Sequence, residues 1–316
     1  MNIDRISEIP TVDKISSSRV AVLMATYNGA NYVEDQLLSV LGQSHKNLEI
    51  FVRDDGSTDD SLRLVEQYQL ETDRIHMLPE GIRYGAPAPS FLTLLDYAEK
   101  FGDYDFFAFC DQDDIWAPSK IDEALDSLKH YSADGYSCNL IAFGFDPLTS
   151  YVVDKPNKLV SLDYVFQSAS AGCTYVFSRR AARLILKQLG DINYMLLKTR
   201  SHDWLVYAIC RSHGLKWIHD HRSFIFYRQH SQNSYGGNRG LPGILKRWAL
   251  LRSGWYRDSV LFNSRFYGMN YDECEVLTRI ARRKIRDRFW LARRAFRFRR
   301  SKGEAIFLAI YFIVII

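Results

Sequence analysis

The stretch Tyr104–Trp116, "YDFFAFCDQDDIW", joins a very apolar run to a turn that carries three carboxylates, Asp111, Asp113 and Asp114. The apolar run predicts a buried strand. Carboxylates beside a buried strand cost solvation free energy unless a cation meets them. Hard oxygen ligands of this kind suit Mg²⁺ or Mn²⁺. The stretch therefore predicts a strand that ends in a metal-binding turn.

Two similar units precede this stretch. "RVAVLMATYNG" ends in the polar turn Thr26–Gly29, and "LEIFVRDDGSTDD" ends in the acidic turn Asp54–Asp60. Helical apolar spacing follows each turn, and the second helix is expected to begin near Ser57 with Ser57 or Asp59 as its cap. Strands that alternate with helices predict an α/β fold with a mostly parallel sheet, covered on both faces. The carboxyl ends of such strands share one edge, so the three turns are expected to converge on one pocket.

The sequence as a whole predicts a division into three parts. Residues 1–18 are expected to be a flexible N-terminus, residues 19–235 the α/β domain, and residues 236–316 a helical and basic extension. Strands are expected in "NLIAFGFD" and "CTYVFSRR", and a helix in "SHDWLVYAICRSHG". Glycines between residues 236 and 243 predict a hinge or loop.

Composition and charge limit the class of protein. The 316 residues are 47% apolar and 25% charged, which is ordinary for a globular chain. Five cysteines without a CxxC pair favour buried free thiols in a reducing compartment. The N-terminus has no apolar signal core, so a cytoplasmic location is expected. Residues 279–302 carry a net charge of +11, whereas residues 1–278 sum to −6, which favours two functional pieces.

The three turns, in this order and spacing, resemble the family 2 glycosyltransferases with the GT-A fold, and the resemblance runs through roughly residues 19–235. "GIRYGAPAPSFLTLL", "SHDWLVYAI" and "YRQHSQNSYG" look most like bacterial rhamnosyltransferases of O-antigen and other cell-surface polysaccharide synthesis. Those enzymes use dTDP-L-rhamnose.

The resemblance implies a site for a nucleotide-sugar donor. The first turn would hold the base, and Asp54 or Asp55 would accept the imide N–H of uracil or thymine. Asp111 would lie nearer the ribose, while Asp113 would bind the metal on the diphosphate, with Asp111 and His230 as further ligands. The residues expected to bind the nucleotide sugar are Thr26, Tyr27, Asn28, Asp54, Asp55, Arg83, Asp111 and Arg228.

The resemblance also implies an acceptor side in "SHDW". Asp203 would act as general base on the acceptor hydroxyl, and one such base suffices for inversion at the anomeric carbon. His202 would orient Asp203 or the acceptor, and Trp204 would stack on a sugar face. Asp114 is expected to orient the turn or a metal-bound water.

Simpler interpretations stay open for each of these residues. "DDGSTDD" and Asp203 are also typical of helix starts, because Asp, Ser and Thr favour those positions. His230 is equally compatible with a structural role. Cys173, Trp116 and Tyr227 are expected to pack in the core.

The basic C-terminal stretch favours an anionic membrane surface over nucleic acid, because nothing upstream resembles a nucleic-acid-binding fold. The apolar tail "AIFLAIYFIVII" would extend about 18 Å as a helix, short of the ~30 Å hydrocarbon core. It is therefore expected to insert shallowly or to pack on the protein, with a terminal core helix as the alternative.

These observations predict a metal-dependent, inverting, non-processive glycosyltransferase, peripheral on the inner face of the cytoplasmic membrane. It would move L-rhamnose from dTDP-L-rhamnose to a lipid-linked saccharide. A UDP-hexose or UDP-N-acetylhexosamine donor is the alternative within the class. An inactive nucleotide-sugar-binding scaffold subunit is the alternative outside it.

Overall fold

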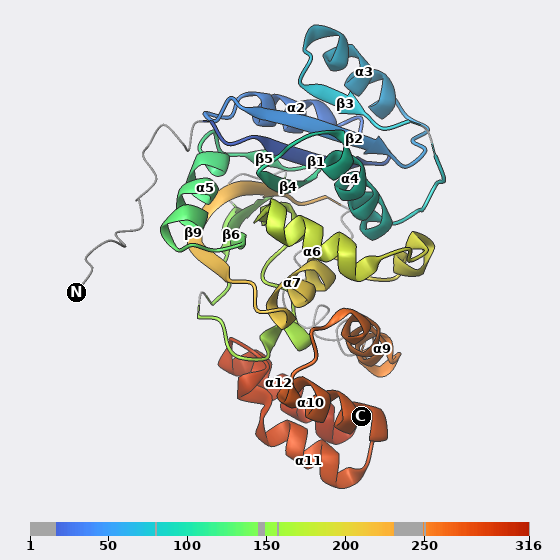
Figure 1. Cartoon of the computed structure of the whole chain (residues 1–316), viewed down its shortest axis with the longest axis vertical. Helices are drawn as coiled ribbons and strands as arrows, with labels where there is room; N and C mark the ends of the chain where they lie inside the picture. The colour runs from blue at the N-terminus through green and yellow to red at the C-terminus, as the bar shows by residue number, and fades with distance from the viewer. Residues whose placement is uncertain are drawn as a thin grey trace, which may run out of the picture.

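The computed structural model describes residues 17–79, 81–144, 149–156, 158–230, 249 and 251–315 (Figure 1). Within these residues, nine strands form one sheet: β1 Val20–Thr26, β2 Leu48–Asp54, β3 Ile75–Met77, β4 Phe106–Asp111, β5 Ile115–Trp116, β6 Gly135–Phe143, β7 Tyr151–Val153, β8 Val176–Ser178 and β9 Trp217–Arg228. The helices are α2 Val33–Leu41, α3 Ser61–Glu71, α4 Pro87–Phe101, α5 Lys120–His130, α6 Arg179–Leu189, α7 His202–Ser212, α9 Trp255–Asn263, α10 Tyr271–Arg282, α11 Ile285–Arg293 and α12 Lys302–Val314.

The sheet follows the order β3-β2-β1-β4-β8-β6-β9-β5, with β7 paired to β6. Strands β3, β2, β1 and β4 pair in parallel, as their alternation with helices predicts. Beyond β4 the pairings are mixed: β8 is antiparallel to both β4 and β6, whereas β6 and β9 are parallel. The α/β prediction is confirmed, and the sheet is parallel in its first half and mixed in its second.

The register of the first strands aligns their carboxyl ends. Thr26, the last residue of β1, pairs with Asp54, the last residue of β2. On the other side of β1, Ala25 pairs with Asp111 at the end of β4. The three polar turns therefore leave the sheet side by side, as expected from a parallel arrangement.

Two apolar clusters cover the two faces of the sheet. Alternate residues of β1 point to opposite faces, so Leu23 joins one cluster and Val22 joins the other. The first cluster contains residues of α4, α6 and α7, and the second contains residues of α2, α3 and α5. Both faces are buried, which explains why β1 reads as a continuous apolar run.

Two local details differ from the sequence-based expectations. Helix α3 begins at Ser61 rather than near Ser57, because Ser57 Oγ donates to Asp54 Oδ1 at 2.6 Å and stays in the turn. Strand β8 is only three residues long, because Gly172–Thr174 forms a 3₁₀ turn before it. Residues 1–16 and the glycine-rich segment 236–243 lie outside the described residues.

The C-terminal helices pack on the cluster that contains α4, α6 and α7, and Figure 1 shows α10, α11 and α12 at the far end of the long axis from α3. Helix α12 buries Ala305, Leu308, Tyr311 and Phe312 against this cluster. One side of α12 therefore forms part of the core. Within the described parts of the chain, no helix has the length and apolar character needed to cross a membrane.

Candidate active site

Side-chain hydrogen bonds join the turn after β4 to the turn after β1. Tyr27 N donates to Gln112 Oε1 at 2.8 Å, and Gln112 Nε2 donates to Tyr27 O at 3.0 Å. A side-chain amide can hold a backbone in this way because it carries both a donor and an acceptor. We call this pair of bonds the Gln112 clamp. Sequence reasoning missed Gln112, since its pairing depends on the register of β1 and β4.

Gly29 permits the close approach of the two turns. A Cβ atom on Gly29 would lie 2.3 Å from Gln112 Oε1, so a larger residue at this position excludes the clamp. Gly29 N also donates to Ser61 Oγ at 2.7 Å, which links the same turn to the first residue of α3. The glycine of "TYNG" is thus required by close packing.

Asn28 and Thr26 join the first turn to the second. Thr58 N donates to Asn28 Oδ1, and Asn28 N donates to Ser57 Oγ, both at 2.8 Å. Thr26 Oγ1 donates to Asp54 Oδ1 at 3.0 Å. Asn28 has φ +47°, a left-handed conformation that asparagine adopts more readily than most residues. These bonds fix the two turns at the edge of the sheet where the nucleotide was expected to bind.

The two carboxylates of the second turn have different surroundings. Asp54 is half-buried, and its Oδ2 accepts from Gly56 N at 3.0 Å. Asp55 is buried, pairs with Arg53 Nη1 at 2.8 Å and accepts from Gly85 N at 2.6 Å. Asp55 therefore anchors the loop before α4, while Asp54 is the less enclosed carboxylate at the sheet edge.

The same loop carries Arg83 onto Tyr27. The Arg83 guanidinium lies 4.8 Å from the centre of the Tyr27 ring, and its Nη2 donates to the Tyr27 hydroxyl. Tyr27 is 40% exposed, so this pair presents a flat aromatic group and a cation at the edge of the sheet. Tyr27 and Arg83, which were both expected to contact the nucleotide sugar, thus contact each other.

The end of β9 brings His230 to the turn after β4. His230 Nε2 lies 2.8 Å from Asp113 Oδ2, and the imidazole stacks on Tyr32 with ring centres 4.6 Å apart. Arg228 Nε donates to Asp113 O at 3.1 Å, and Arg228 Nη2 donates to Asp35 Oδ2 at 2.8 Å. Arg228 and His230 are therefore neighbours of Asp113, although Asp113 lies far from both in the sequence.

Asp111 and Asp114 form the most enclosed part of this turn. Asp114 is fully buried; its Oδ1 accepts from Arg228 N at 3.2 Å, and its Oδ2 has no hydrogen-bond partner among the described residues. Burial raises the pKa of Asp114 well above its usual value, and the charges of Asp111 and Asp113 add to this effect. Enclosed carboxylates with an unpaired oxygen fit a cation site, since a divalent ion would replace the protons that the carboxyls otherwise keep.

Asp203 belongs to the same electrostatic environment. Burial, together with the negative charges of Asp113 and Asp203, raises the pKa of Asp111 to about 7. Asp203 lies in the first turn of α7, where its Oδ1 accepts from Trp204 N at 2.7 Å and from Ser201 Oγ. The Asp203 carboxylate therefore bonds to the backbone at the start of α7, and its charge also acts on the turn after β4.

The surroundings of His202 and Trp204 do not fit the acceptor contacts expected for them. His202 packs on Phe91 with ring centres 4.4 Å apart, and burial lowers the pKa of its imidazole. Trp204 is 5% exposed, and its Nε1 donates to Tyr164 O at 2.8 Å. A ring with so little exposed surface is not available to stack on a sugar. Trp204 therefore packs in the core, whereas an effect of His202 on Asp203 stays a prediction, since the charge of Asp203 acts on the His202 imidazole.

Lys120 places a cation inside the protein near the acidic turn. It is fully buried at the start of α5, and its Nζ lies 3.4 Å from the centre of the Trp116 ring. Burial lowers the pKa of Lys120 to about 8, although nearby groups that include Asp114 act in the opposite direction. Sequence reasoning missed Lys120, because nothing in the local pattern distinguishes it from an exposed lysine.

A mixed sheet flanked by helices, with an acidic turn at the carboxyl end of β4, fits the class of GT-A glycosyltransferases. The model of the family Glycosyl transferase family 2 matches residues 21–180, and the chain belongs to this family. It is 32% identical over 292 residues to the dTDP-rhamnosyl transferase RfbG of Shigella flexneri, covering 92% of this chain and 99% of that protein. It is also 32% identical over 185 residues to the putative teichuronic acid biosynthesis glycosyltransferase TuaG of Bacillus subtilis, covering 57% of this chain and 68% of that protein.

Solved structures show the same fold. TarS 1–349 of S. aureus, in complex with UDP, matches with a TM-score of 0.58 and 16% identity over 90% of this chain and 74% of that chain. The mannosyltransferase PcManGT of Pyrobaculum calidifontis, in complex with GDP-Man and Mn²⁺, matches with a TM-score of 0.50 and 17% identity over 93% of this chain and 88% of that chain. The predictions of a GT-A fold and of a glycosyltransferase are confirmed.

Proposed function

We propose that this glycosyltransferase moves L-rhamnose from dTDP-L-rhamnose to a hydroxyl of a lipid-linked saccharide, with inversion, in the synthesis of a surface polysaccharide. The choice of donor is supported by the resemblance to a dTDP-rhamnosyl transferase over almost the whole of both chains. The reaction is supported by the place of Asp203 in the first turn of α7, where its charge acts on Asp111 at the carboxyl edge of the sheet.

The donor would lie along the joined turns. Tyr27 and Arg83 offer a flat face and a cation to the base and its diphosphate, and Asp54 accepts the imide N–H. Thymine and uracil both present this donor, so the contact does not distinguish dTDP from UDP. TarS of S. aureus, which has the same fold, has been crystallised with UDP-GlcNAc, and UDP-N-acetylhexosamine therefore remains the second candidate donor.

Mn²⁺ or Mg²⁺ is the cofactor that the acidic turn would hold. Asp113 and His230, 2.8 Å apart, are the proposed ligands together with Asp111. A bound divalent cation would neutralise charge on the diphosphate as the sugar leaves. Arg228, fixed on Asp113 O and Asp35, would add a second positive charge close by.

Asp203 is the proposed general base. Its position at the start of α7 is fixed by the bond from Trp204 N to Oδ1, so its other oxygen, Oδ2, has a defined direction. In this role the carboxylate takes the proton of the acceptor hydroxyl as that oxygen attacks the anomeric carbon.

A comparison of transfer with donor binding tests the proposal. Asp203→Asn keeps an oxygen that can accept from Trp204 N, so α7 should fold and donor binding by calorimetry should change less than about twofold, while transfer falls about 10²–10⁴-fold. Asp258→Asn, which removes an acid from the first turn of α9, serves as the control. Undiminished transfer by Asp203→Asn would assign the base to another residue. A wild-type protein that neither transfers nor hydrolyses any nucleotide sugar in a panel would favour the scaffold alternative.

We further propose that the protein is peripheral on an anionic membrane surface, through α11 and α12. On α12, Ile306, Ile310, Ile313 and Val314 are 42–62% exposed, and their spacing puts them on one face, opposite the buried one. Phe289 on α11 is 50% exposed. Apolar side chains of this kind beside a basic segment fit the interface of an anionic bilayer, where a lipid-linked acceptor would be found.

A further inference from the structure

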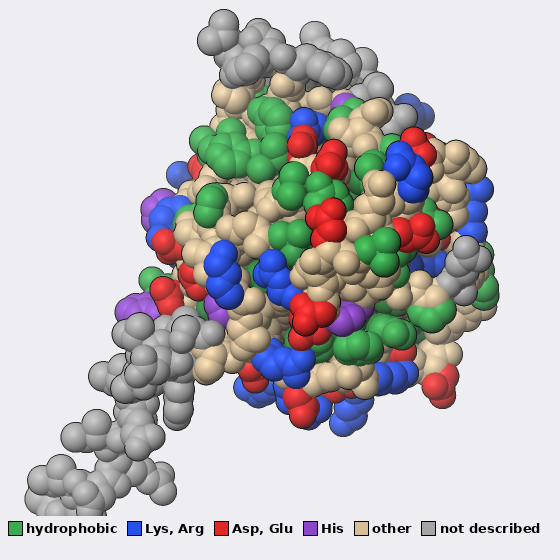
Figure 2. Space-filling model, turned by 90° about the horizontal axis from the view of Figure 1, so that it is seen from above, with side chains coloured by type: hydrophobic (Ala, Val, Ile, Leu, Met, Phe, Trp, Pro, Cys, Tyr) green, Lys and Arg blue, Asp and Glu red, His purple; other side chains and the backbone are tan. Residues whose placement is uncertain are grey.

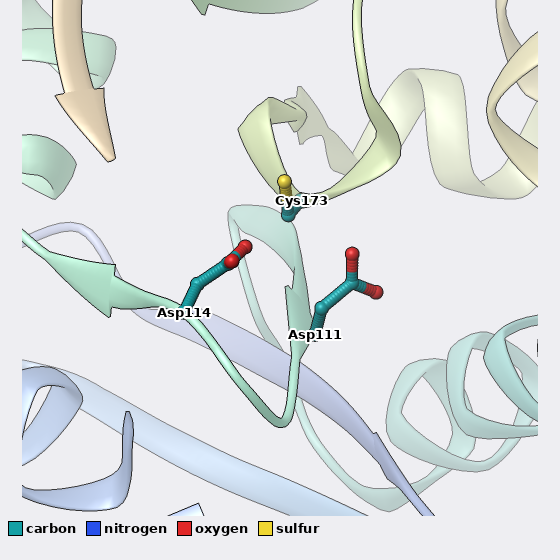
Figure 3. Close-up of side chains that lie close together, drawn as sticks. All are labelled: Asp111, Asp114 and Cys173. Carbon is teal, nitrogen blue, oxygen red and sulfur yellow. The ribbon is translucent and has the colours of Figure 1, made fainter. Parts of the chain in front are cut away.

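A second set of metal-ligating atoms lies on the inner side of the acidic turn. Figure 3 shows Asp111 at the end of β4 and Asp114 in the following turn, with Cys173 between them, on the 3₁₀ turn Gly172–Thr174. One oxygen of each carboxylate and the Cys173 sulfur all lie within 4.8 Å of one another. The set is separate from Asp113 and His230, which bond to each other at 2.8 Å.

The size of this cluster is close to that of a tetrahedral metal site. Zinc binds oxygen at about 2.0–2.2 Å and sulfur at about 2.3 Å, which puts such ligand atoms about 3.5 Å apart. The three atoms therefore need to approach by up to about 1.3 Å, which changes of side-chain torsion provide. Three protein ligands leave the fourth position of the ion open.

An independent observation indicates that this space accepts a cation. Asp114 Oδ2 is fully buried and has no hydrogen-bond partner among the described residues, while Oδ1 of the same carboxylate is occupied by Arg228 N. A buried carboxylate oxygen without a partner is unfavourable and is seldom left in that state. In Figure 3 the Asp114 carboxylate points toward the loop of Cys173.

The sulfur decides which cation fits. Magnesium and manganese prefer oxygen ligands, whereas a thiolate with two carboxylates favours thiophilic ions such as Zn²⁺ and Cd²⁺. Cys173 is fully buried, and its turn is closed by the bond from Tyr175 N to Gly172 O at 2.9 Å, so the thiol is held in place before any ion binds. Binding releases the thiol proton, and the protons that the two carboxyls keep, to solvent as the bonds to the metal form.

We propose that Asp111, Asp114 and Cys173 form a binding site for a thiophilic divalent cation, Zn²⁺ or Cd²⁺, that inhibits the enzyme. Inhibition follows because Asp111 is shared: a carboxylate held on the inner ion is no longer available to the donor and its Mn²⁺ or Mg²⁺. This second part rests on the proposed function, whereas the binding of the ion does not.

Direct metal binding tests the site without any measurement of activity. Zn²⁺ affinity is measured by competition with a chromophoric chelator, and Cd²⁺ binding by the ultraviolet absorption of the cadmium–thiolate bond. Cys173→Ser should weaken Zn²⁺ binding by at least about tenfold, since even loss of a second-sphere partner costs a metal site about this much. It should also remove the cadmium–thiolate band. Cys210→Ser, a fully buried cysteine on α7, should keep both properties of the wild type.

Two further outcomes decide the proposal. Cys173→Ala also removes the thiol. If both Cys173 variants keep the thermal stability of the wild type and both lose Zn²⁺ binding, the loss comes from the missing ligand and not from misfolding. Equal Zn²⁺ affinity in wild type and both Cys173 variants would overturn the site. For the inhibition, Zn²⁺ should lower transfer by the wild type in saturating Mn²⁺ and lower it far less in Cys173→Ser; equal inhibition of the two proteins would overturn the shared role of Asp111. If the wild type transfers no sugar, the binding experiments still decide whether the site exists.

Discussion

At the scale of single residues, the site depends on contacts that short motifs do not reveal. The acids of "DQDD" were predicted because carboxylates after an apolar run need a cation, and the structure places Asp111 where the charge of Asp203 acts on it. Gln112 and Lys120 were missed: the first bonds to the backbone of Tyr27 in the turn after β1, and the second is buried only because α5 packs on that face. His202 and Trp204 were assigned by their place beside Asp203, which says nothing of which helix face they occupy.

The Gln112 clamp gives a prediction at this scale. Gly29→Ala forces the Gln112 amide away, and Gln112→Ala removes it, so each variant should weaken donor binding by about 1–3 kcal/mol through loss of the same two hydrogen bonds. Because both changes break one contact, the double variant should be little worse than either single variant. Calorimetry with the donor and Mn²⁺ measures this. Strictly additive losses would mean that Gly29 and Gln112 act independently.

At the scale of elements, the first half of the chain was predictable and the second half was less so. β1, β2 and β4 are buried on both faces, so continuous apolar runs followed by polar turns locate them well. The antiparallel pairings of β8 with β4 and β6 are contacts between distant segments, and no local pattern encodes them. The start of α3 was placed too early because Ser57, an acceptable cap, bonds to Asp54 instead.

The pairing of β6 with β9 gives a prediction about pH. His219 on β9 is buried between Ser137 Oγ at 3.0 Å and Asn139 Oδ1 at 3.1 Å. Burial lowers its pKa from 6.5 to about 4, and the charge of Arg300 contributes. The unfolded chain therefore binds an extra proton between these values, and stability falls as the pH falls through 6.5 toward 4.

His219→Gln removes this proton without removing the polar partners. The free energy of unfolding of the wild type, minus that of the variant, should fall by about 3 kcal/mol between pH 7 and pH 4. Denaturant unfolding at the two pH values measures this difference, in which contributions from other groups, such as the raised pKa of Asp111, cancel. A difference independent of pH would show that His219 is not buried in its neutral form.

At the scale of the whole molecule, the C-terminal helices are built into the catalytic core. Arg300 Nε lies 3.1 Å from Asp163 Oδ2, and both side chains are buried. Other arginines of the basic segment pair with carboxylates as well: Arg279 with Asp287, Arg297 with Asp272 and Arg299 with Glu304. Part of the charge of residues 279–302 is therefore neutralised within the fold, which the net charge of the segment alone did not reveal. The division into domains stays a prediction, since residues 231–248 lie outside the described residues.

The membrane proposal gives the prediction at this scale. Ile306→Ser, Ile310→Ser and Ile313→Ser combined should reduce sedimentation with anionic vesicles, because these exposed side chains would lose apolar burial worth about 1.5–3 kcal/mol each at full insertion. Deletion of α12 is the poorer test, as it would open the core. The control changes Leu38 and Leu70 to serine; they are exposed on α2 and α3, at the end of the molecule where Figure 2 shows acidic and basic side chains intermixed. Unchanged sedimentation of the triple variant would contradict the anchor.

The most direct test of the central claim is the metal dependence of donor binding. Calorimetry compares dTDP-L-rhamnose binding to the wild type, to Asp113→Asn and to Asp103→Asn, which alters an acid whose side chain is 87% exposed. The account predicts that Mn²⁺ strengthens binding to the wild type and to Asp103→Asn, and that Asp113→Asn loses this enhancement. Equal, Mn²⁺-enhanced binding by all three proteins would contradict it.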